Sequence, residues 1–177
     1  LAQKYGMQIR SIVFPRNQHN PDYDEVLLER GIICYRGTEK HPVYKADGRR
    51  NSRLPHKRLY RLFDSHLPLS GDHLTSWGDV VEASGICNVA ASRYLRPTVN
   101  SATMLFGLRL KRIVKAMEEA GRTQKIFHLW THPQDFGLAP EENLQGLKTI
   151  LGHFSKIQEQ YGMVSLNMME VADMAKR

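Results

Sequence analysis

The chain has 177 residues, of which 41% are hydrophobic, a length that suits one ordinary domain with a single core. Its net charge of +7 leaves an acidic-polymer partner open, but no helix-turn-helix, RNA-recognition or zinc-finger signature is present. No stretch of about 18 uninterrupted apolar residues exists. We therefore expect neither nucleic-acid binding nor a membrane span.

The start of the chain and its two cysteines bear on how the protein is made and where it is found. The chain opens on Leu1 with neither an initiator Met nor a secretory apolar run, so we expect it to start inside a longer gene product. Cys34 and Cys87 lie far apart, without CxxC spacing and among apolar neighbours. They are predicted to be buried free thiols in a reducing compartment, which indicates a cytoplasmic protein.

The first part of the chain predicts a βαβ unit. A β-like run, Gln8–Phe14, ends at a proline, and the polar residues Arg16–Asn20 then form a loop at the carboxyl end of that strand. Pro21–Arg30 is predicted to be a helix with acids in its first turn, and Ile32–Tyr35 a second strand. The connection is long enough for the two strands to be parallel.

Residues 38–85 are predicted to form a long, irregular excursion with one helix around Leu54–His66. His66–His73 holds two histidines and one aspartate, and an exposed loop is favoured there over a metal site. Arg93–Pro97 ends a further extended segment. Ser101–Glu119 then shows helical spacing, and Gly121 is expected to stop the helix. Its basic residues are predicted to form a solvated face: Arg109, Lys111, Arg112 and Lys115.

The last third predicts a second long helix, Pro140–Gly162, a short strand over Met163–Leu166, and a final helix through Ala175 that Asn167 caps. Alternating strands and helices argue for an α/β fold with a mostly parallel sheet. In such folds, ligands gather at the carboxyl ends of the strands.

The segment Lys125–Pro133 is the most informative part of the chain, because β-favouring residues deliver a histidine to the point where a proline must end the strand. His128, Trp130 and His132 would share one face. On a strand, four residues span about 13 Å, which is too far for one metal to join the two histidines. His132 is therefore a candidate acid, base or substrate contact; a hydrogen-bonded strand-end histidine is the alternative.

Polar groups also follow the two earlier strands, at Arg16, Asn17 and Arg36. Three strands thus send cationic or hydrogen-bonding groups toward one rim, which favours the functional interpretation of His132.

Three segments carry a family resemblance: FPRNQ at Phe14–Gln18, GIICYRG at Gly31–Gly37, and HLWTHPQDFG at His128–Gly137. In order and spacing they resemble the second half of a polysaccharide deacetylase of the NodB-homology type, most closely the branch found with surface-polysaccharide gene clusters. The resemblance covers about Tyr5 to Ala175.

That resemblance implies a partial, distorted (β/α) barrel with mostly parallel strands, over the whole of residues 1–177. It implies hydrolysis of N- or O-acetyl groups from an acetylated carbohydrate, with a divalent metal, usually zinc, in the full-length protein. Arg16 would match the arginine that orients the catalytic aspartate, and His132 the acid that protonates the leaving group. Asn17, Arg36, His128 and Trp130 would line the substrate groove.

The sequence departs from the family in lacking both the aspartate pair and the HxxxH-type metal motif, which His128 and His132 cannot replace because they are predicted to lie about 13 Å apart on a strand. We therefore expect no metal ligands in these residues, and no activity from this chain alone. The exposed apolar edge at Ile9–Phe14 would favour association of two copies. The competing hypothesis is a non-catalytic carbohydrate- or polyanion-binding module, in which Arg16, Arg36 and Trp130 hold a ligand without turnover.

Overall fold

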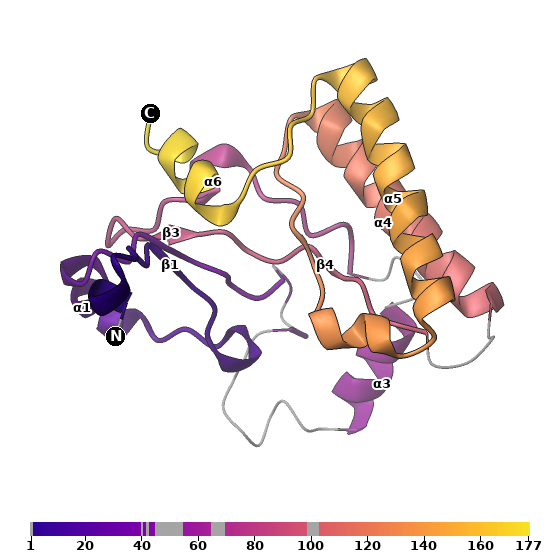
Figure 1. The fold of residues 1–177 in the computed structure, drawn as a ribbon, viewed down its shortest axis with the longest axis horizontal. Coiled ribbons are helices and arrows are strands. Elements are labelled where there is room, and N and C mark those ends of the chain that lie inside the picture. The colour runs from indigo at the N-terminus through magenta and orange to yellow at the C-terminus, as the bar shows by residue number, and fades with distance from the viewer. Residues whose placement is uncertain (1, 40, 42, 45–54, 65–69, 99–102) are drawn as a thin grey trace. The chain divides into compact units, whose positions relative to one another are not determined.

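The computed structural model describes residues 2–39, 41, 43–44, 55–64, 70–98 and 103–177 (Figure 1). The chain forms two compact units. The first comprises Leu1–Thr38, Thr75–Ala90 and Ser165–Arg177, and the second comprises Glu39–Leu74 and Ala91–Val164. The irregular excursion predicted over 38–85 is thus divided between the two units.

The first unit contains a parallel sheet of three short strands in the order β1-β2-β3: Ser11–Ile12, Cys34–Tyr35 and Cys87–Asn88. Between β1 and β2 lie a 3₁₀ turn, Pro21–Tyr23, and helix α1, Asp24–Glu29. The predicted βαβ unit is confirmed, although its strands are shorter than expected. Further 3₁₀ turns lie at Ala2–Tyr5, Pro15–Asn17 and Trp77–Asp79.

The two cysteines lie opposite each other on β2 and β3, and both are fully buried. They are free thiols, as predicted, and burial raises the pKa of Cys34 to about 11. Helix α6, Met168–Ala175, contacts β2. It begins at Asn167, whose side chain accepts from the N–H groups of Met169 and Glu170, so the predicted cap is confirmed.

Strand β1 lies at one edge of this sheet. Ile9 and Val13, on either side of it, are 57% and 43% exposed. An edge of this kind is open to pairing with another chain. Association of two copies through it stays a prediction.

The second unit pairs two parallel strands, β4 (Arg93–Tyr94) and β5 (Leu129–Trp130), with Tyr94 opposite Trp130. Helices α4 (Thr103–Thr123) and α5 (Pro140–Tyr161) lie side by side (Figure 1). Their apolar faces form the core with the end of β4; its buried residues are Leu95, Ile113, Met117, Ile150 and Ile157. Helix α3 (Pro55–Asp64) and a 3₁₀ turn at Pro133–Gly137 complete the unit.

Helix α4 does not stop at Gly121, as the sequence suggested, but continues to Thr123. Gly121 is instead a packing position, since a Cβ atom there would lie 2.8 Å from Ile157 Cγ2 on α5. The helix ends where Gln124 takes a φ of 53°. The strand predicted at Met163–Leu166 is also wrong, because these residues have no regular secondary structure and no ladder partner among the described residues.

The fold is therefore mixed, with helices and short parallel strands, as the predicted α/β class requires. Among the described residues the strands form a three-stranded and a two-stranded sheet and no closed barrel. None of the helices described is both long enough and apolar enough to cross a lipid bilayer.

Candidate functional site

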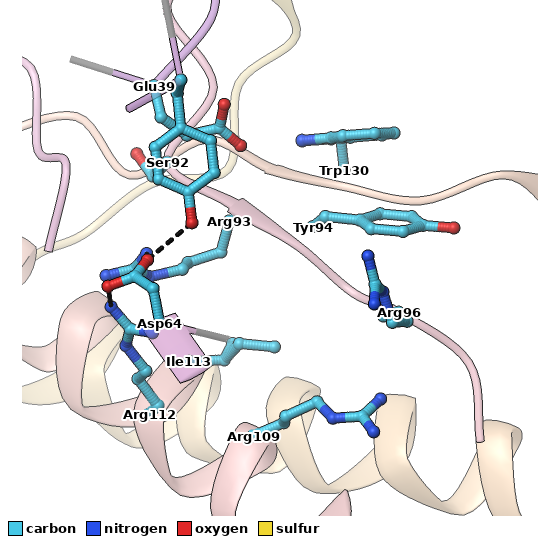
Figure 2. A pocket seen from close by; sticks show the side chains of 11 residues that line it. Glu39, Asp64, Ser92, Arg93, Tyr94, Arg96, Arg109, Arg112, Ile113 and Trp130 are labelled. Atoms are coloured by element: carbon cyan, nitrogen blue, oxygen red, sulfur yellow. Dashed lines mark hydrogen bonds and ion pairs between the residues drawn. The ribbon is translucent and has the colours of Figure 1, made fainter. Parts of the chain in front are cut away.

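A pocket of about 340 Å³ opens in the second unit, beside the paired strands β4 and β5 (Figure 2). Strand β4, the residues that follow it, and helix α4 supply most of its walls. The residues that line it are Glu39, Tyr44, Asp64, Ser92, Arg93, Tyr94, Arg96, Arg109, Arg112, Ile113 and Trp130. The pocket thus combines several cations with an aromatic surface.

Asp64, the last residue of α3, is the fully buried carboxylate of this pocket. Its oxygens accept hydrogen bonds from the Tyr44 hydroxyl at 2.6 Å and from the Ser70 N–H at 2.7 Å. Arg112 Nη2 lies 3.0 Å from Oδ1, and Arg93 Nη1 lies 3.8 Å from Oδ2. Burial alone would raise the pKa of Asp64, but these hydrogen bonds and the Arg112 charge hold it below its usual value.

Arg93 and Arg112 are themselves buried, with side chains only 9% and 6% exposed. Both donate to the carbonyl oxygen of Gly71, which thereby links the two guanidinium groups. Burial lowers the pKa of Arg93, and the neighbouring Arg112 charge lowers it further. The solvated face predicted for the basic residues of α4 is therefore wrong at Arg112, which turns inward to meet Asp64.

The aromatic surface of the pocket comes from the paired positions of β4 and β5. The Tyr94 and Trp130 rings stack with centroids 4.3 Å apart, and the His132 ring stands edge-on to Trp130 at 5.3 Å. Asp135 accepts from the Tyr94 hydroxyl at 2.6 Å and from the His132 N–H at 3.2 Å. Burial and the Asp135 carboxylate raise the pKa of Tyr94 to about 12. The His132 side chain is exposed, but Asp135 links the His132 backbone to the hydroxyl of Tyr94.

His73 belongs to the same unit and is 7% exposed, with its ring 5.4 Å from the ring of Tyr44. Its Nε2 lies 2.6 Å from the Ser70 hydroxyl oxygen, and its carbonyl accepts from Ser92 at 2.9 Å. Burial, together with the Arg93 charge, lowers its pKa to about 4, so the ring is neutral near pH 7. The exposed loop predicted for His66–His73 is therefore wrong at His73; residues 65–69 lie outside the described part of the chain.

The first unit brings together two of the predicted site residues. Asn17 is 9% exposed, and its Oδ1 accepts from Arg36 Nε at 2.9 Å, so the ends of β1 and β2 are joined. Arg16 is exposed and takes a φ of 58°, an uncommon value for a residue with a side chain. Next to them, His19 Nε2 lies 2.5 Å from Asp24 Oδ1.

The structure therefore assembles the predicted site residues as two groups, Asn17 with Arg36 and Trp130 with His132. His128, with its backbone N–H donating to Ser92 Oγ at 3.0 Å, lies one ladder position before β5. Arg16 belongs to the first unit and His132 to the second, so the common rim predicted for them stays a prediction.

Sequence reasoning missed Tyr94, Asp135 and Asp64. The signal for Tyr94 was its place at the end of an extended segment, since an aromatic residue there can pair with Trp130 on a neighbouring strand. Asp135 stands three residues beyond His132, the spacing at which a carboxylate reaches back to a turn's first N–H. No sequence signal indicates that Asp64 is buried.

A metal site does not fit the residues that the structure describes. Among them, no three His, Cys, Asp or Glu side chains are grouped closely enough to hold a metal ion. A catalytic zinc site needs about three protein ligands and an open position. A comparison of the chain with protein-family models, curated proteins and solved structures finds no match.

Proposed function

We propose that this chain carries the proton-donating side of the active site of a metal-dependent polysaccharide deacetylase, built on a distorted (β/α) barrel. The observation that carries the proposal is the position of His132. It lies two residues beyond the end of the parallel strand β5, and its imidazole stands 5.3 Å from the Trp130 ring. Aromatic faces in pockets commonly hold the apolar side of a ligand, and strand ends in α/β folds are where ligands bind.

The chemistry assigned to these residues is proton transfer during acetyl hydrolysis. A water oxygen bonds to the acetyl carbon and gives its proton to the catalytic aspartate that the resemblance implies, the carbon–nitrogen or carbon–oxygen bond to the sugar breaks, and His132 protonates the departing amine or alkoxide. Asp135 supports this role by fixing the backbone of His132 and the hydroxyl of Tyr94. Histidine suits this role because it exchanges protons most readily near neutral pH.

The remaining roles follow from the family resemblance. Arg16 would orient the catalytic aspartate, and Asn17 and Arg36 would line the groove, where their mutual hydrogen bond gives them a fixed geometry. Because the described residues do not group metal ligands, we assign no step to them through a metal.

The proposal is tested on the complete gene product with an acetylated oligosaccharide, by measuring acetate release and metal content. His132→Ala should lower kcat by about 10² to 10⁴, the contribution of a positioned general acid, without loss of metal. His128→Ala is the control and should lower kcat less, because His128 lies about 13 Å from His132 along an extended chain and cannot reach the same atom. Equal losses in both variants, or metal loss in His132→Ala, would contradict the assigned role.

A second candidate is a carbohydrate- or polyanion-binding module without turnover, and the arginines that line the pocket favour it. Here the oligosaccharide would bind, Trp130→Ala would weaken binding, and no acetate would be released by any form of the protein. Acetate release that depends on His132 excludes this candidate.

A further inference from the structure

The charges that line the pocket of the second unit are unbalanced. Among the described residues, four arginines line it, Arg93, Arg96, Arg109 and Arg112, against two carboxylates, Glu39 and Asp64. Asp64 already forms ion pairs, with Arg112 Nη2 at 3.0 Å from Oδ1 and with Arg93 Nη1 at 3.8 Å from Oδ2. The lining therefore carries an excess of positive charge in a partly enclosed space, where electrostatic interactions are stronger than in water.

The buried guanidinium groups also have hydrogen-bonding capacity that the described part of the chain does not use. Arg112 Nε and Nη1 and Arg93 Nε are buried and have no hydrogen-bond partner among the described residues. Buried donors of this kind are costly unless an acceptor reaches them. Both side chains are more than nine-tenths buried and line the pocket, so an acceptor inside it is the natural partner.

Arg96 and Arg109 form a second cationic pair in the pocket. Burial lowers the pKa of Arg109, and the charge of Arg96 lowers it further, as expected for two like charges in one pocket. Figure 2 shows both groups on the side of the pocket that also holds the Tyr94 and Trp130 rings. The Arg96 guanidinium carbon lies 6.0 Å from the centre of the Tyr94 ring.

We propose that this pocket binds an anionic sugar, with its carboxylate or phosphate held by Arg96 and Arg109 and its ring against Trp130. An oxyanion accepts two parallel hydrogen bonds from one guanidinium group, and its charge turns the repulsion between two such groups into attraction. The sugar part of this inference rests on the proposed carbohydrate function; the anion site rests on the arginines alone.

The test is calorimetric titration of the full chain at low salt with glucuronate, inorganic phosphate and glucose. Glucuronate should bind, and glucose should bind at least tenfold more weakly. Arg109→Gln and Arg96→Gln should each weaken glucuronate binding ~10- to 100-fold, the value of a charge-assisted hydrogen bond. Lys111→Gln removes the same charge from an exposed position of α4 and should leave binding unchanged.

Further variants separate the contribution of the sugar ring from that of the anionic group. Trp130→Ala should weaken glucuronate binding but not phosphate binding; an equal effect on both would overturn the placement of the sugar ring. Absent glucuronate binding, or equal losses in Arg109→Gln and Lys111→Gln, would overturn the pocket itself. His132→Ala should keep glucuronate affinity, so a failure of the deacetylase proposal and a failure of this one give different results.

Discussion

The prediction that follows most directly from the pocket concerns Asp64. Asp64→Asn keeps the shape of the side chain but removes the charge that faces two buried arginines, one at 3.0 Å. Breaking a buried ion pair by neutralising one partner costs about 3 to 5 kcal/mol, since the other charge stays buried. We expect the lower value, about 3 kcal/mol, because the amide oxygen can still accept from the Ser70 N–H, and the amide NH2 can donate to the Tyr44 hydroxyl oxygen.

For a chain of this length, such a loss lowers Tm by about 6 to 12 °C. Thermal unfolding followed by circular dichroism measures it. Tyr44→Phe is the matched control, since it removes one hydrogen bond to the same carboxylate and leaves both ion pairs; we expect a loss of about 1 to 2 kcal/mol. If Asp64→Asn costs no more than Tyr44→Phe, Asp64 does not hold the arginines in place and the account of the pocket fails.

Two further predictions concern His73 and Gly121. The pKa of His73 is about 4 in the folded protein against an ordinary 6.5, so the unfolded chain binds more protons as pH falls through this window. The contribution of His73 to the free energy of unfolding should therefore be fully present above pH 6.5 and fall by up to about 3 kcal/mol toward pH 4. Urea titrations at both ends of this window measure the fall, and His73→Gln should make it smaller. An unchanged pH profile in His73→Gln would refute the assignment. Gly121→Ala should destabilise the protein by about 1 to 2 kcal/mol, because the new methyl group meets Ile157 at 2.8 Å and overpacking outweighs the gain in helix propensity. Gly107→Ala, in the same helix with nothing within 4 Å, should stabilise it by about 0.5 to 1 kcal/mol, and the same sign for both substitutions would contradict the packing of α4 on α5.

Local signals predicted much of the fold correctly. The βαβ unit, the helix around Pro55–Asp64 and the cap at Asn167 each depend on residues close together in the sequence. Gly121 shows where such signals fail. A glycine near the end of a helical pattern indicates a stop, but here it gives α5 room to approach, which only the packing reveals. The strand predicted at Met163–Leu166 fails likewise, since a strand needs a partner that its own residues do not specify.

The candidate site divides in the same way. His132 and Trp130 were predictable because strand alternation and a terminating proline place them on one face at one end, and their rings do lie 5.3 Å apart. Arg112 was not, because the helical pattern assigns it to a basic face. Its burial depends on Asp64, which lies 48 positions earlier in the chain. Long-range pairs of opposite charge leave no periodic trace in a single sequence.

Asp135 joins the two proposed roles of the second unit. Its carboxylate accepts from the Tyr94 hydroxyl, which belongs to the aromatic surface, and from the backbone of His132, the proposed acid. A ligand that presses on the Tyr94–Trp130 pair therefore acts on the same carboxylate that fixes His132. The exposed imidazole thus has a defined position relative to the aromatic surface without being buried itself. Under the proposed function, this position would place the exposed imidazole of His132 beside a sugar that is held against the aromatic surface.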